Sequence, residues 1–190
     1  VLSKYISEQE ALSWVPKDVP VVVVNPGFPF GPYDFRPTPT GRMVLEILQE
    51  RLPGYFPGGL TAVDVEDVAM GHVLAAQKGE VGKRYLLSGT NLTYRDFILS
   101  TASRAGVKPS GRKLPLPVAR LVAHAFVVRR KLFGIDPLLT PGLLNYSARH
   151  LYYDNTRAKK ELGWETTPLN DTLDKTITFF RTELAAGSFT

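Results

Sequence analysis

The stretch Val21-Val22-Val23-Val24-Asn25-Pro26-Gly27 decides the fold. Its four consecutive β-branched residues predict a strand, and an unbroken apolar run is typical of a strand covered on both faces, as in a parallel sheet. A helical pattern of apolar residues precedes it from Leu2 to Val15, and Pro16 ends that pattern. A helix that leads into such a strand is half of a βαβ unit, so we expect an α/β fold in which Asn25-Pro26-Gly27 stops the strand.

The rest of the chain is expected to alternate further strands and helices. Short strands are predicted at 61–63, 84–88 and 150–153, and helices at 43–52, 64–78, 94–105, 116–133, 155–162 and 169–184. Asp64 and Thr93 are predicted N-caps, and Gly163 is predicted to end its helix. This order predicts a partial Rossmann fold, that is, a doubly wound parallel sheet lacking its N-terminal half, with a mostly helical substrate-binding cap.

The same order suggests how the chain is divided. Residues 1–87 are expected to form the remaining C-terminal part of the Rossmann domain, with an inserted substrate loop at 26–60. Residues 88–190 are expected to form the mostly helical substrate-binding region. The loop begins at the carboxyl end of a parallel strand, where open α/β sheets bind their ligands.

Composition and charge restrict the classes of function. Hydrophobic residues make up 44% of the 190 residues, as in an ordinary globular protein, and the absence of cysteine excludes disulfides and thiolate metal sites. The net charge of +5 favours an anionic small molecule, and no basic run is interleaved with aromatic residues as in single-strand binders. We expect a small-molecule substrate, no nucleic-acid partner and, since nothing suggests secretion, a cytoplasmic location.

Ser3-Lys4 begins the motifs that carry the chemistry. A lysine on a helix is usually a solvated surface residue, and Glu8 four positions on offers Lys4 an ion pair. The ordered motifs behind it change that interpretation. They are S-K-Y-I-S-E-Q-E-A (3–11), V-V-V-V (21–24), N-P-G-F-P-F-G-P (25–32), P-T-P-T-G-R (37–42), V-D-V-E-D-V-A-M-G-H (63–72) and Y-D-N-T-R-A-K-K-E-L-G-W (153–164).

This succession resembles the extended short-chain dehydrogenase/reductase family over essentially the whole chain. It is most similar to the hopanoid-associated sugar epimerases and the dihydroflavonol-reductase-like proteins. The family's catalytic motif is Tyr, three residues, Lys; Ser3-Lys4 matches its end, so the tyrosine would stand immediately before Val1. The glycine-rich dinucleotide fingerprint and the family's catalytic Ser/Thr are absent from the sequence, so we expect the chain to be the C-terminal part of such an enzyme.

The resemblance implies NAD or NADP as cofactor. It assigns Lys4 a catalytic role, in which the ammonium favours the phenolate of the tyrosine one turn away and also bonds the nicotinamide ribose. The tyrosine would move a proton on the substrate hydroxyl while the nicotinamide takes or returns hydride. Asn25, Pro26, Gly27 and Phe28 are implied to lie along the cofactor, and the first helix is implied to form a homodimer face in the full-length protein.

The loop from Arg36 to Arg42 is the predicted substrate contact. Thr40 is expected to cap the helix that follows, and Arg36, Thr38, Thr40 and Arg42 around a helix N-terminus would suit an anionic group, such as that of a nucleotide-sugar. The alternative is a proline-stiffened loop that only starts a helix.

Two further features have structural interpretations. The acidic motif at 63–72 has poor spacing for a metal site and the resembled family needs none, so we expect no metal. His72 falls on the apolar stripe of its helix, which predicts a buried histidine. Helix 116–133 is expected to be a buried cap helix, with a lid over the substrate or a membrane contact through residues 129–131 as alternatives.

Three hypotheses of function follow. The first is an NAD(P)-dependent epimerase or dehydratase that acts on a sugar or nucleotide-sugar. The second is an NADPH-dependent ketone or aldehyde reductase of the dihydroflavonol-reductase type. The third is a non-catalytic cofactor-binding regulator, against which Lys4 argues. In every case we expect the isolated chain to be inactive.

Overall fold

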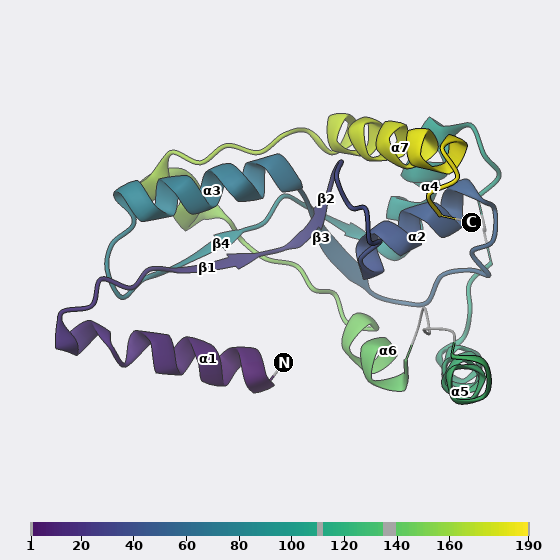
Figure 1. Cartoon of the computed structure of the whole chain (residues 1–190), viewed down its shortest axis with the longest axis horizontal. Helices are drawn as coiled ribbons and strands as arrows, with labels where there is room; N and C mark the ends of the chain where they lie inside the picture. The colour runs from purple at the N-terminus through teal and green to yellow at the C-terminus, as the bar shows by residue number, and fades with distance from the viewer. Residues whose placement is uncertain (1, 110–111, 135–139, 190) are drawn as a thin grey trace.

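The structure is a computed structural model that describes residues 2–109, 112–134 and 140–189. Within these residues, β1 (Val23–Pro26) pairs with β4 (Arg84–Leu87), while β2 (Phe28–Phe30) and β5 (Thr90–Thr93) flank β3 (Gly59–Asp64). β1 and β4 are parallel, β2 and β3 are parallel, and β5 is antiparallel to β3. Parallel strands connected through helices confirm the predicted α/β class (Figure 1).

The helices surround the two small sheets in groups. They are α1 (Leu2–Leu12), α2 (Pro39–Leu48), α3 (Val65–Lys78), α4 (Tyr94–Ala105), α5 (Leu116–Phe133), α6 (Pro141–Ser147) and α7 (Leu169–Ala185), with a 3₁₀ turn η1 (Val15–Lys17) and a π-helical turn η2 (Ala158–Leu162). Figure 1 shows α3 and α1 on opposite sides of the β1–β4 pair. α2, α4 and α7 pack together beside the other sheet, and α5 contacts α6.

β1 runs almost directly into β2, although the two strands belong to different sheets. Gly27 joins them, and its N–H donates to the Leu87 carbonyl at 2.9 Å, which extends the β1–β4 ladder by one residue. A Cβ on Gly27 would stand 2.8 Å from the carbonyl oxygen of Thr61 in β3. Because that distance is closer than Cβ atoms come to oxygen, only glycine lets the chain cross between the sheets here.

β1 differs from the expected buried strand. It includes Asn25 and Pro26, which pair with β4 and do not stop the strand, and its residues are half-buried or exposed. Among the described residues β4 is its one neighbouring strand, and α1 contributes no buried residue to cover it. The valine run therefore predicted a parallel strand correctly but overestimated its burial.

Several boundaries also differ from the expected ones. α2 begins at Pro39 rather than at residue 43, because proline suits the first helical position, and Thr38 provides the N-cap instead of Thr40. The sequence pattern did not predict β5 or α6. Segment 150–153 forms only an isolated bridge, between His150 and Gly59, and no strand.

His72 is exposed, so the predicted buried histidine is wrong. The buried stripe of α3 consists of Val68, Gly71 and Ala75, one position away from the stripe that the sequence suggested. The His72 ring instead contacts the Val68 carbonyl of its own helix through Nδ1 at 2.8 Å. The predicted N-cap at the start of this helix, Asp64, is confirmed.

Two apolar cores hold the layers together. The larger lies between β2, β3, α2, α4 and α7. The smaller packs α3 and β4 against η2, where Tyr85, Leu162 and Trp164 are fully buried. The Trp164 indole donates to the Asp67 carbonyl at 2.7 Å, and the Asp67 carboxylate accepts from the N–H and the hydroxyl of Thr167 at 2.6 and 2.8 Å. Motif 153–164 therefore serves packing, as its sequence indicated.

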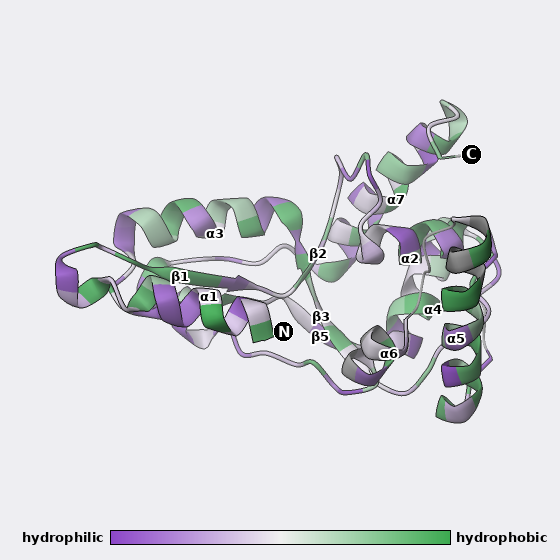
Figure 2. Cartoon of the chain, turned by 60° about the horizontal axis from the view of Figure 1, so that its bottom comes forward, coloured by the Kyte–Doolittle hydropathy of each residue, from purple (hydrophilic) through white to green (hydrophobic). Residues whose placement is uncertain are grey.

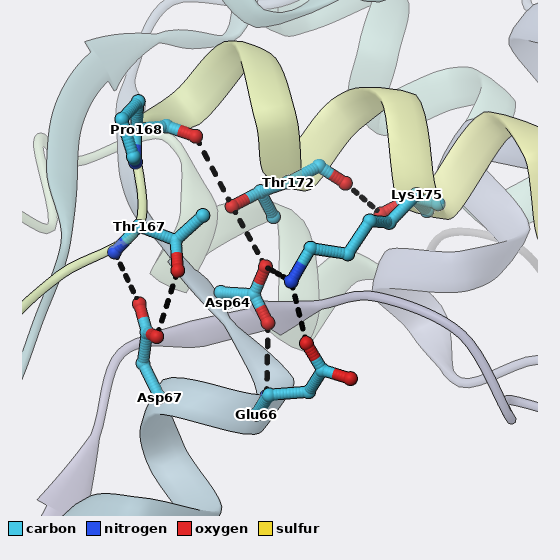
Figure 3. A network of polar contacts seen from close by, with 8 residues as sticks. Asp64, Glu66, Asp67, Thr167, Pro168, Thr172 and Lys175 are labelled. Atoms are coloured by element: carbon cyan, nitrogen blue, oxygen red, sulfur yellow. Dashed lines mark hydrogen bonds and ion pairs between the residues drawn. The ribbon is translucent and has the colours of Figure 1, made fainter.

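Asp64 ends β3, begins α3, and joins both to α7 through its carboxylate (Figure 3). The side chain is fully buried. It accepts from the Glu66 N–H at 2.9 Å and from the Thr172 hydroxyl at 3.1 Å, and it pairs with the Lys175 amine at 3.0 Å. Lys175 also pairs with the Glu66 carboxylate, and its bond to Glu66 followed by the charge of Asp64 raises the pKa of Lys175 to about 12.

Replacing Lys175 is expected to destabilise the fold, because Asp64 would keep a buried charge without its cation. Lys175→Met should lower the free energy of unfolding by about 2 kcal/mol, less than a fully buried pair would lose, since the amine is partly solvated. Because folding raises the pKa of Lys175, the stabilisation from its charge is complete below pH 10.5 and is lost as the pH rises through about 12. Urea unfolding across this range should therefore show the difference from wild type shrinking with pH.

The matched control is Lys108→Met, which removes an exposed lysine outside this network. It should leave the free energy of unfolding within about 0.5 kcal/mol of wild type. An equal effect of both variants would show that Lys175 acts only through net charge.

Candidate functional site

α1 is attached to the sheet by one acidic side chain, Glu8. Its carboxylate accepts from Nδ2 of Asn25 in β1 at 3.2 Å and pairs with the guanidinium of Arg84 at the start of β4. The Glu8 side chain is only 13% exposed, although no residue of α1 is buried as a whole. The expected ion pair between Lys4 and Glu8 is therefore wrong, because Glu8 turns to the sheet.

Lys4 stands one helical turn before Glu8, on the same face of α1. In Figures 1 and 2 the N-terminal end of α1 points toward the carboxyl end of β1, so this turn continues from Asn25 in the direction of Pro26 and Gly27. The Lys4 side chain is exposed and forms no ion pair or hydrogen bond with any residue that the structure describes. Its ammonium is available to a ligand at this edge of the sheet.

Asn25 offers an acceptor at the same edge. Its Oδ1 is buried and has no hydrogen-bond partner within the described part of the chain, while its Nδ2 is engaged by Glu8. A buried acceptor without a partner costs about 1–3 kcal/mol, so a ligand that brings an N–H donor would be stabilised there. The residues present therefore fit a group such as the nicotinamide carboxamide.

The predicted anion site at the start of α2 already holds a carboxylate of the chain itself. Asp34 accepts from the Thr38 N–H at 2.9 and 3.1 Å and from the Thr38 hydroxyl at 2.8 Å. The Thr38 hydroxyl in turn accepts from the Gly41 N–H at 3.3 Å and lies 3.0 Å from the Thr40 hydroxyl. A substrate phosphate would have to displace Asp34 from this helix N-terminus.

The two arginines of the loop are placed differently from the threonines. Arg36 and Arg42 are both exposed and form no ion pair within the described residues. The structure brings the Thr38 and Thr40 side chains together, while Arg42 contacts Thr38 through its backbone N–H, which donates to the Thr38 carbonyl at 2.8 Å. A substrate contact by any of these four residues stays a prediction.

An apolar cavity of about 360 Å³ lies beside this loop. Phe28 from the predicted cofactor stretch and Thr40 from the predicted substrate loop both line it, so the structure brings these two sets of residues to one place. Met43 of α2, Leu60 of β3 and Phe126 of α5 form further walls. Sequence reasoning missed this cavity, because its walls come from distant segments and their apolar side chains cannot be told from core residues.

α5 matches the predicted helix 116–133 at both ends. Its residues Ala119, Val122 and Phe126 line the cavity. Of its described side chains only Ala119 and Ala123 are buried, so the expected buried cap helix is wrong. The side chains of residues 129–131, on which the predicted membrane contact rested, lie outside the described residues. In the described part of the chain no helix is long and apolar enough to cross a membrane.

Comparison with known proteins identifies relatives but no matching family model. A putative dihydroflavonol 4-reductase from Synechocystis sp. is 34% identical over 185 residues, which cover 94% of this chain and 53% of that protein. This similarity agrees with the predicted resemblance to the extended short-chain dehydrogenase/reductases. It spans about half the length of the curated relatives it matches.

Solved structures confirm the Rossmann-type fold. The crystal structure of gox2253 is 39% identical with a TM-score of 0.78, covering 96% of this chain and 56% of that one. PA4631, a nucleoside-diphosphate-sugar epimerase from Pseudomonas aeruginosa, is 29% identical with a TM-score of 0.77, covering 98% of this chain and 55% of that one. The fold is shared, at 18% and 20% identity, by RMD from Pseudomonas aeruginosa with NADPH and by DesIV from Streptomyces venezuelae with NAD.

The N-cap of α2 gives a test that separates the two threonines. Thr38→Ala should lower the free energy of unfolding by about 1 kcal/mol, because the Gly41 N–H loses its acceptor and Asp34 loses one donor. Thr40→Ala should cost about half of that or less, since Thr40 does not cap the helix. Urea unfolding of both variants measures the difference, and equal losses would contradict the assignment of Thr38 as the cap.

The attachment of α1 can be tested through Glu8. Glu8→Gln keeps the shape of the side chain but removes the ion pair with Arg84, so α1 should be held less firmly and Lys4 placed less well. We expect kcat of the protein that contains this chain to fall about tenfold, with little change in the KM of the substrate. Glu10→Gln is the control, because the Glu10 carboxylate accepts from Trp14, just after α1, and has no ion pair or hydrogen bond to the sheet among the described residues. A loss of kcat as large in Glu10→Gln would rule out a positioning role for Glu8.

Proposed function

We propose that the protein containing this chain is an NAD(P)-dependent oxidoreductase or epimerase that exchanges hydride at a carbon bearing oxygen. The observation that carries this proposal is the attachment of α1 to Asn25 of β1 through Glu8, which brings the N-terminal end of α1 to the carboxyl end of β1. This edge leaves one exposed cation and one buried acceptor without protein partners among the described residues. Open α/β sheets bind dinucleotides at such an edge.

The residues of the chain have distinct roles in this proposal. A bound nicotinamide supplies or accepts the hydride. Lys4 donates a hydrogen bond to the ribose, and its charge stabilises the phenolate of a tyrosine placed directly before Val1, one turn away on the same helix face. The phenol gives its proton to the carbonyl oxygen as hydride adds to the carbonyl carbon, and the phenolate takes a proton in the reverse direction.

The stretch from Asn25 to Phe28 would hold the nicotinamide ring. Asn25, whose Oδ1 has no partner among the described residues, would accept from the carboxamide N–H, and the backbone of Pro26 and Gly27 would lie along the ring. The cofactor is supported by the NADPH and NAD bound to structures of the same fold. Either dinucleotide satisfies the contacts described, because none of them reaches the 2′ position that separates NAD from NADP.

Two substrate classes remain within this proposal. A sugar or nucleotide-sugar is supported by the net charge of +5 and by the likeness to a nucleoside-diphosphate-sugar epimerase. A ketone or aldehyde is supported by the likeness to a putative dihydroflavonol 4-reductase. A cytoplasmic location and a homodimer that uses α1 also belong to the proposal, the latter supported by the exposed apolar residues Leu2, Tyr5 and Ile6 of α1.

Lys4→Met tests the proposed acid/base chemistry. Without the ammonium the upstream phenol should keep its proton at neutral pH, so kcat should fall by about 100-fold or more, and the pH at half-maximal rate should rise. Steady-state oxidation of an alcohol substrate with NAD⁺ and NADP⁺, followed by nicotinamide absorbance against pH, measures both. The 190-residue chain by itself serves as an inactive baseline, because its sequence contains no glycine-rich dinucleotide fingerprint.

Lys17→Met is the matched control, because Lys17 lies after α1, stacked over the ring of Trp14. It should leave kcat and its pH dependence unchanged. Full activity of Lys4→Met would contradict the proposed role of Lys4, whereas cofactor binding without any turnover by the wild-type protein would support the third hypothesis, a cofactor-binding regulator. Reduction that consumes one NADPH for each product would support a reductase over an epimerase, since an epimerase returns its hydride.

A further inference from the structure

The cavity beneath α5 bears on the chemical class of the substrate, which the sequence left open. We propose that the substrate places an apolar, ring-containing body in this cavity, and that Val122 and Phe126 set the size of the body that fits. The position of the reacting carbon rests on the proposed function. The binding of the apolar body rests on the cavity alone.

The walls of the cavity are almost entirely apolar. Of the lining residues that the structure describes, only Thr40, Tyr94 and Ser147 have a polar side chain, and none is charged. A diphosphate or a sugar ring would lose its hydration there without enough donors and acceptors to replace the water. A hydrocarbon ring system gives up no such hydration, and its burial releases water from the apolar walls.

Aromatic side chains give the cavity a preference for rings. Phe56 and Tyr94 pack with their ring centroids 5.0 Å apart and their planes at 53°. Phe28 and Phe126 add two more rings to the lining. Because aromatic rings pack favourably against other rings in tilted and offset arrangements, these walls fit a flat or fused ring body.

The size and position of the cavity agree with a substrate site. A volume of about 360 Å³ lies within the range of pockets that hold small organic ligands. Phe28, the residue after Gly27, lines the cavity, so the cavity adjoins the stretch proposed to hold the nicotinamide. A ligand whose body fills the cavity can therefore extend its oxygen-bearing carbon toward that stretch.

α5 supplies the outer wall from one stripe of residues. Ala119, Val122 and Phe126 follow the three- and four-residue spacing of a single helix face, and all three line the cavity. Leu121, on a different face, is 72% exposed. Because Ala119 is fully buried, Val122 and Phe126 are the positions where side-chain size can change the cavity without disturbing the packing of the helix.

The test is the binding of trans-1-decalone, a fused bicyclic ketone, to the protein that contains this chain. Calorimetric titration without cofactor measures its Kd. Val122→Trp should fill the cavity and raise Kd by about tenfold or more. Leu121→Trp adds the same side chain to the same helix on the solvent side and should leave Kd within about twofold of wild type.

A second variant guards against misfolding of the first. Phe126→Ala enlarges the cavity, so kcat/KM for a steroid ketone relative to decalone should rise about tenfold. Equal effects of Val122→Trp and Leu121→Trp, or no change in preference in Phe126→Ala, would overturn the inference.

The outcomes also separate this inference from the proposed function. Decalone binding that depends on Val122, without nicotinamide oxidation on any carbonyl substrate and without epimerisation of any sugar substrate, would support the cavity assignment and contradict the proposed function. Cofactor-dependent turnover of UDP-galactose by a protein that does not bind decalone would do the opposite.

Discussion

The buried carboxylate of Asp64 is the interaction on which the arrangement of the molecule depends. A carboxylate removed from water is tolerated only when it is paired and hydrogen-bonded, so the start of α3 and the Thr172 and Lys175 side chains of α7 must be in place together. Asp64 also ends β3, the middle strand of its sheet. β2 takes its register from β3, so the position of Asp64 also fixes the position of Phe28 in β2. Phe28 directly follows Asn25-Pro26-Gly27, where the candidate site lies.

The site itself is held by polar contacts more than by packing. α1 buries no residue, so Glu8 and its two partners on β1 and β4 do what apolar contacts do for the other helices. Such an attachment is directional, since an ion pair and an amide hydrogen bond fix the rotation of the helix about its axis. The rotation of α1 determines the direction in which Lys4 points. Because salt screens the ion pair between Glu8 and Arg84, the orientation of Lys4 is sensitive to ionic strength.

The sequence predicted what depends on neighbours along the chain. The N-caps Asp64 and Thr93, the left-handed end at Gly163 and both ends of α5 follow local rules, and the structure confirms them. It failed where the outcome depends on distant groups. His72 and its buried neighbours differ by one position on a helix, which the apolar pattern alone does not resolve.

The parts of the site that escaped sequence reasoning are also long-range. Glu8 pairs with a residue 76 positions away, and the cavity combines walls from several segments between Phe28 and Ser147. The family resemblance supplied the predicted roles of Lys4 and Asn25, because these roles depend on a three-dimensional arrangement that the spacing of residues in the sequence does not reveal. It did not reveal that Asp34 already occupies the start of α2.

Asp34 and Gly41 form a coupled pair with a consequence for how this protein can change over evolution. A Cβ at position 41 would stand 2.0 Å from Oδ2 of Asp34 and 2.8 Å from Cζ of Phe180. One added methyl group would therefore expel the carboxylate from the helix start and strain the larger core at once. Descendants that bind a phosphate at the start of α2 must lose Asp34 and keep Gly41. Position 34 is therefore free to vary in evolution, whereas position 41 must remain glycine.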